Sequence, residues 1–70
     1  MSAPIRILLN GAPREFPAPL TLAQLLDELA LAGRRLAVER NGEIVPRSEL
    51  GQARVSDGDR IELVVAVGGG

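Results

Sequence analysis

The fold is decided by residues 21–29 of the chain, which read TLAQLLDEL. Leucines recur there at spacings of three and four residues, the pattern of one face of an α-helix: Leu22, Leu25, Leu26 and Leu29. Thr21 and Gln24 have the spacing of a capping box, in which two side chains satisfy free amides at the start of a helix. We therefore predict an amphipathic helix that begins after Thr21 and ends at a left-handed cap on Gly33.

Alternating apolar residues predict a β-hairpin before this helix. Ile5, Ile7 and Leu9 alternate with other residues as far as Asn10-Gly11, the dipeptide that favours a type I′ turn. A second strand is expected over residues 12–16. It contains a proline, and proline cannot donate a hydrogen bond to a neighbouring strand, so this strand is expected at an edge of the sheet.

The chain after the helix contains three further predicted strands. Residues 36–40 form the first, and Asn41-Gly42 turns the chain into a short strand at 43–45 that Pro46 ends. Turn-forming residues at 56–59 precede the most apolar strand, at 60–66. A nearly continuous apolar run is typical of a central strand that neighbours cover.

This order of elements predicts an α+β domain with the ubiquitin-like β-grasp fold. A mixed sheet of four to five strands carries the helix on one face, with the first and last strands as the central pair. Residues 1–66 make up the predicted domain and residues 67–70 a flexible glycine tail. The predicted core packs the leucines of the helix against five residues of the sheet: Ile5, Ile7, Val38, Ile61 and Leu63.

Composition excludes several classes of protein. The chain has 70 residues and a mass of 7.4 kDa, with no cysteine, histidine or lysine. Disulfides, thiolate or imidazole metal sites and the usual catalytic nucleophile pairs are therefore excluded, and we expect neither a metal site nor an enzyme. A net charge of −1 and 1% aromatic residues disfavour binding to nucleic acid.

No membrane association is expected either. The longest apolar run, residues 63–67, is far too short to span a membrane. The first residues lack the charged and apolar regions of a signal peptide. We therefore expect a cytoplasmic protein.

Three glycines, Gly68, Gly69 and Gly70, directly follow the last predicted strand. One interpretation is a loose end or a linker. The other is a substrate arm, since residues without a Cβ fit a narrow channel and adopt backbone conformations closed to other residues. In that interpretation Gly68 and Gly69 thread into a partner enzyme, and the α-carboxylate of Gly70 attacks the α-phosphate of ATP to give an acyl-adenylate.

Several motifs together resemble the ThiS family of sulfur carriers of thiamine biosynthesis. They are IRILLNG at 5–11, NGEIVPR at 41–47, DGDRIE at 57–62 and the glycine end. The resemblance implies that a ThiF-type enzyme adenylates Gly70 with ATP, and that a cysteine desulfurase or another donor supplies the sulfur of a thiocarboxylate. Thiazole synthase (ThiG) then combines that sulfur with deoxyxylulose phosphate and dehydroglycine. The chain itself is a carrier and co-substrate and binds no cofactor.

Strand parity suggests where such partners dock. If Ile61 and Leu63 face the helix, Val64 and Ala66 face the other side, with Leu8 beside them on the neighbouring strand. We interpret these residues as an exposed apolar patch for both partners, with Val67 leading into the channel. Ordinary exposed apolar residues, common on any protein surface, are an equally open interpretation.

Three other functions stay open at the level of sequence. The small subunit of molybdopterin synthase shares the same tail chemistry and differs in the acceptor. A ubiquitin-like modifier would be joined through Gly70 to lysines of target proteins. A β-grasp binding module for RNA is disfavoured by the lack of basic excess and aromatics, and it gives no reason for the glycines.

Overall fold

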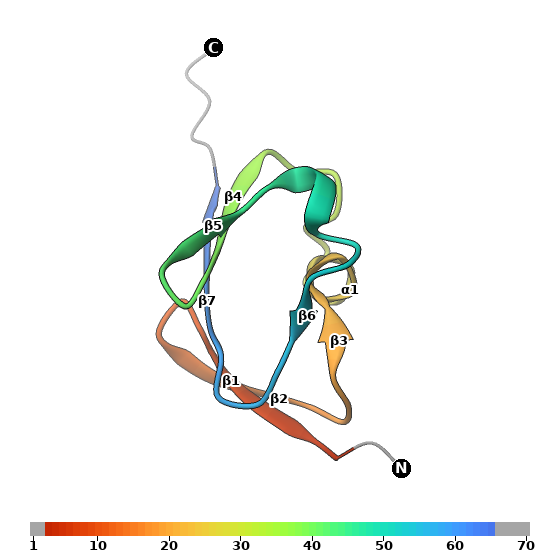
Figure 1. Ribbon diagram of the computed structural model, residues 1–70, viewed down its shortest axis with the longest axis vertical. Helices are drawn as coiled ribbons and strands as arrows, with labels where there is room; N and C mark the ends of the chain where they lie inside the picture. The colour runs from red at the N-terminus through yellow and green to blue at the C-terminus, as the bar shows by residue number, and fades with distance from the viewer. Residues whose placement is uncertain (1–2, 66–70) are drawn as a thin grey trace.

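The computed structural model describes residues 3–65, so Ala66 and the predicted tail at 67–70 lie outside the described residues. Figure 1 shows the elements in chain order. They are β1 (Ile5–Leu9), β2 (Ala12–Phe16), β3 (Leu20–Thr21), α1 (Leu22–Glu28), β4 (Leu36–Arg40), β5 (Glu43–Val45), the 3₁₀ turn η1 (Arg47–Glu49), β6 (Arg54–Val55) and β7 (Arg60–Val65). No helix within residues 3–65 has the length and apolar character needed to cross a membrane.

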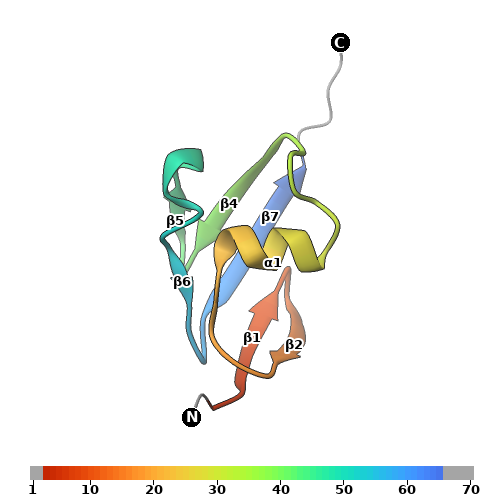
Figure 2. The same ribbon diagram turned by 90° about the vertical axis from the view of Figure 1, so that its right-hand side faces the viewer.

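Five strands form one mixed sheet in the order β2-β1-β7-β4-β5. β1 and β7 run parallel, and the other neighbours in this sheet are antiparallel. Helix α1 lies across one face of the sheet (Figure 2). The predicted β-grasp architecture is confirmed, with β2 at an edge and β7 in the centre.

The core lies between α1 and the face of the sheet that the helix covers. Burial alternates strictly along β1 and along most of β7, so every second side chain points into the core. Each core residue predicted on the sheet is buried, as are Leu22, Leu25 and Leu26 of the helix. The core also contains Leu9, Phe16 and Val55.

The predicted start of α1 is confirmed, and its predicted end is wrong. Thr21 caps the first turn, with both bonds of the capping box present. The helix ends at Glu28, and Ala30 rather than Gly33 takes the left-handed position after it, with φ 59°. The amide of Leu31 then donates to the Leu26 carbonyl and that of Ala30 to the Asp27 carbonyl, which is the Schellman pattern.

The early end of α1 has a physical cause. Leu31 follows Leu22 by nine positions, about two and a half helical turns, so a longer helix would point Leu31 away from the core. Ending the helix at Glu28 lets the chain turn back, and Leu31 packs against the core instead.

A second, two-stranded sheet joins β3 to β6 and was not predicted. Leu20 lies opposite Val55 and Thr21 opposite Arg54. The pair closes the core beside α1, where the Val55 side chain is completely buried. This small sheet therefore fixes the start of the helix relative to the loop that leads to β7.

Candidate functional site

The central strand β7 is the element that leads toward the glycines, so its anchoring defines the base of the candidate site. Five predicted site residues lie outside the described residues: Ala66, Val67, Gly68, Gly69 and Gly70. The other two, Leu8 and Val64, lie on β1 and β7. The contacts that hold β7 are therefore the described part of the site.

One Asn-Gly turn holds β7 near its C-terminal end. Asn10 and Gly11 have φ values of 49° and 82°, as the predicted type I′ turn requires. The Asn10 side chain also bonds to β7: its Oδ1 accepts from the Leu63 amide at 2.7 Å, and its Nδ2 donates to the Leu63 carbonyl at 3.4 Å. The sequence pattern predicts this turn but not the bonds from its asparagine to β7.

The other Asn-Gly turn holds the start of the same strand. Asn41 Oδ1 accepts from the Arg60 amide at 2.9 Å, while Nδ2 donates to a carboxylate oxygen of Asp59 at 3.1 Å. The Asn41 amide donates to the Arg60 carbonyl at 2.8 Å. The two turns thus fasten β7 at two places, at its first residue through Asn41 and past its middle through Asn10.

The carboxylates before β7 also serve the backbone. Asp57 accepts from the Arg6 amide at 2.8 Å, and Asp59 accepts from the Ser56 amide at 2.9 Å. The first bond ties the 56–59 turn to β1 and the second closes the turn itself, so both acidic residues are accounted for without a ligand. Among the residues that the structure describes, no group of acidic side chains is arranged to hold a metal ion.

The face of the sheet opposite α1 carries the described part of the predicted docking patch. Leu8 is 41% exposed and Val64 is 54% exposed, so both lie on the surface. They are not neighbours, however, because Leu8 pairs with Arg60, four residues before Val64 on β7. Four residues of strand correspond to about 13 Å. The expectation that Leu8 lies beside Val64 is therefore wrong.

A second strongly exposed apolar residue lies on this face, two strands away from Val64. Ile44 of β5 is 70% exposed, and it pairs with Glu39, which in turn pairs with Glu62 on β7. Val64 pairs with Ala37, the next residue of β4 on the same face. We define the open-face patch as Ala37, Ile44 and Val64 with Glu39 and Glu62. Sequence reasoning missed Ile44 because its strand has only three residues and no clear alternation.

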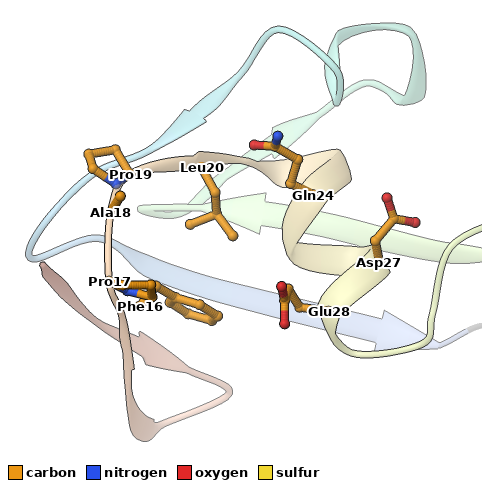
Figure 3. A pocket seen from close by; sticks show the side chains of 8 residues that line it. All are labelled: Phe16, Pro17, Ala18, Pro19, Leu20, Gln24, Asp27 and Glu28. Atoms are coloured by element: carbon orange, nitrogen blue, oxygen red, sulfur yellow. The ribbon is translucent and has the colours of Figure 1, made fainter. Parts of the chain in front are cut away.

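Leu8 instead borders a groove of its own. This groove, of about 420 Å³, is lined by Arg6, Ile7, Leu8, Pro13 and Gly58. A second groove, of about 390 Å³, lies where the Phe16–Leu20 segment passes α1. Figure 3 shows the prolines of that segment on one side and Gln24, Asp27 and Glu28 of the helix on the other. Gln24 already bonds to Thr21, so Asp27 and Glu28, adjacent residues of the helix, are the remaining polar side chains of this groove.

Comparisons with known proteins agree on one family. The model of the ThiS family matches residues 7–70. The sulfur carrier protein ThiS of Escherichia coli is 38% identical over 68 residues, covering 94% of this chain and 100% of that protein. A crystal structure of the thiamine biosynthesis protein ThiS from Geobacter metallireducens has a TM-score of 0.82 and 32% identity, covering 94% of this chain and 100% of that one.

A longer relative is also similar to this chain. The thiazole synthase of Paramagnetospirillum magneticum is 47% identical over 66 residues, which cover 94% of this chain. The matched region is only 20% of that protein, so the chain spans about a fifth of the length of this relative.

Proposed function

Because the chain belongs to the ThiS family, we propose that it is a sulfur carrier protein that supplies sulfur for thiazole formation in thiamine biosynthesis. The full-length similarity to the ThiS protein of Escherichia coli is the observation that carries this proposal. In this role the chain is a carrier and co-substrate, and the catalysts are its partners.

The proposed chemistry takes place at the α-carboxylate of Gly70. A carboxylate oxygen attacks the α-phosphate of ATP, which forms the acyl-adenylate and releases pyrophosphate. Sulfide then attacks the acyl carbon, and AMP leaves. Where a cysteine desulfurase is the donor, the outer sulfur of its persulfide attacks instead, AMP leaves, and a thiol reduces the resulting acyl disulfide to the thiocarboxylate. The product is a thiocarboxylate, a softer and stronger nucleophile than the carboxylate. ATP is bound by a ThiF-type adenylating enzyme, and a cytoplasmic location is part of the proposal.

Contacts within the fold support the proposal that the chain is a carrier and that its partners are the catalysts. Every described aspartate in the turn before β7 bonds to backbone or to Asn41, so these side chains have structural tasks. β7 is paired on both sides at its start and leads directly toward the three glycines. A well-anchored strand followed by residues without a Cβ is suited to presenting a chain end to another enzyme.

We propose the open-face patch as the docking surface for the adenylating enzyme. Ile44, Ala37 and Val64 provide apolar area on three neighbouring strands. Glu39 and Glu62 lie directly opposite each other, which is unfavourable unless a cation is nearby. A partner surface with an apolar centre and an arginine or lysine between the two carboxylates would complement this patch.

The similarity to a thiazole synthase favours that enzyme as the acceptor of the sulfur. The relative from Paramagnetospirillum magneticum carries a region like this chain within a protein named for the acceptor reaction. This observation favours the thiazole route over the molybdopterin route and over a protein modifier. No finding favours the RNA-binding alternative.

Intact-mass measurement tests the proposal directly. We expect the protein, incubated with a ThiF-type enzyme, ATP and sodium sulfide, to gain the mass difference of one oxygen replaced by one sulfur. The ThiS protein of Escherichia coli, treated in parallel, is the positive control. An unchanged mass, with the control converted, would overturn the proposal.

Two further measurements separate the alternatives. The thiocarboxylated protein is mixed with thiazole synthase, deoxyxylulose phosphate and dehydroglycine, and thiazole formation is followed. Formation of thiazole supports the proposed acceptor. Its absence, together with conjugates of Gly70 to lysines of other proteins, would instead identify a modifier.

Substitution of Ile44 tests the docking surface. We expect Ile44→Ser to raise the KM of the adenylating enzyme for the carrier about tenfold, since a central apolar contact contributes more than about 1 kcal/mol. Its exposed side chain predicts little change in stability, so a urea titration is the control. An unchanged KM would exclude Ile44 from the interface.

A further inference from the structure

The two edges of β7 are held in different ways near its C-terminal end. On the β4 side, backbone pairing runs without a gap from Ile61 to Val65. On the β1 side, strand pairing involves only Arg60 and Ile61. The amide of Asn10 adds one more bond, to the Ile61 carbonyl at 2.9 Å, and β1 then turns away into its hairpin. Only one strand therefore flanks the last residues of β7.

The side chain of Asn10 takes the place of the missing strand. Its amide group offers the same acceptor and donor as a peptide unit, and both are directed to Leu63, at 2.7 Å and 3.4 Å. These bonds are part-buried, where a hydrogen bond is less exposed to competition from water. Leu63 is thereby fixed from both sides, by Val38 of β4 and by Asn10.

The turn alone does not require this residue. Glycine and aspartate also occur at positive φ in type I′ turns. Aspartate would keep the acceptor for the Leu63 amide and lose the donor, and glycine would lose both. The contact with β7, rather than the turn, therefore requires asparagine at position 10.

We infer that Asn10 is a positioning residue for the reaction at Gly70. By fixing Leu63 it holds the last described residues of β7, from which the sequence continues toward Gly70. This inference rests on the proposed function. A small displacement at the base of a reacting arm is costly, because the rate of a positioned reaction falls steeply with misalignment.

The second Asn-Gly turn provides a matched control. Asn41 has a φ of 52° and two side-chain bonds, as Asn10 does, but its bonds go to Arg60 at the start of β7 and to Asp59 before it. Asn10→Gly and Asn41→Gly both keep a turn that glycine tolerates, and each removes one set of side-chain bonds. A structural role alone predicts the same effect on adenylation from both substitutions.

The test measures steady-state adenylation of the full chain by a ThiF-type enzyme, at a temperature at which all variants are folded. We expect Asn10→Gly to lower kcat about tenfold through misplacement of the reacting end. KM should change little because the open-face patch is intact. Asn41→Gly should leave kcat within about twofold. Asn10→Asp keeps the shorter bond but turns a carboxylate oxygen toward the Leu63 carbonyl, so it should recover only part of the loss.

Amide hydrogen exchange of the free proteins gives an independent readout. Exchange at Leu63 should accelerate in Asn10→Gly, and exchange at Arg60 should accelerate in Asn41→Gly. Equal losses of kcat in both glycine variants, or an unchanged kcat in Asn10→Gly, would overturn the inference and leave the proposed function standing. If the wild-type protein is not adenylated, the proposed function fails and the inference fails with it.

Discussion

The two faces of the sheet are built from the same strands and serve different purposes. On the face covered by α1, side chains such as Ile7, Val38 and Ile61 are almost completely buried. On the open face, the alternate residues of β7 include Glu62 and Val64, which are exposed. The difference shows how one strand can contribute to stability and to recognition through alternate residues. Substitutions on the two faces should therefore have separable effects.

The largest expected effect separates the two faces within β7. Ile61→Ala should lower the free energy of unfolding by about 2–5 kcal/mol, since it leaves a cavity in the core. The Ile61 side chain has no exposed area, so neighbouring residues must lose contacts. Urea denaturation measures the loss, and Val64→Ala on the open face is the control, with an expected change below about 0.5 kcal/mol. Equal losses would contradict the assignment of the faces.

A smaller effect on the free energy of unfolding is expected at Ala30, just after the end of α1. Ala30 has φ 59°, a conformation that costs a residue with a Cβ about 1–2 kcal/mol. Ala30→Gly should raise the free energy of unfolding by about 1 kcal/mol, because greater freedom of glycine in the unfolded chain offsets part of the relief. Thermal unfolding measures this gain. A decrease in stability would show that Ala30 is not strained.

The smallest expected effect concerns the open face. Glu62→Gln should stabilise the protein by about 0.2–1 kcal/mol, because it removes repulsion from Glu39 on the neighbouring strand. Because Glu62 is exposed, the gain in the free energy of unfolding should lie at the low end of this range, and added salt should reduce it further. Urea titrations at low and high ionic strength measure both. A gain that does not depend on salt would point to a cause other than charge.

Local patterns account for most of the fold that sequence analysis predicted. Alternation of side chains predicted β1, a nearly continuous apolar run predicted β7, the two Asn-Gly dipeptides predicted both turns, and the Thr21 capping box predicted the start of α1. Each of these patterns spans only a few consecutive residues, so it can be recognised in the sequence alone. The two-layer arrangement then followed because one helix covers one face of the sheet.

The features that were missed depend on contacts between distant residues. The end of α1 is decided by the packing of Leu31, which outweighs the preference of glycine for a cap. The β3–β6 pair is too short to produce a periodic pattern. The bond from Asn10 to Leu63 joins residues 53 positions apart. Separation of Leu8 from Val64 follows from strand register, which side-chain alternation alone does not determine.

The position of β7 also bears on how the protein is made. It is the last described strand, and it lies between β1 and β4, which have no contact with each other in the sheet order. While the ribosome is still producing residues before Arg60, the nascent chain lacks the strand that joins the two halves. Because such non-local pairing forms late, partial chains stay open to proteolysis. A truncated product is therefore expected to be degraded rather than to compete with the finished carrier for its partners.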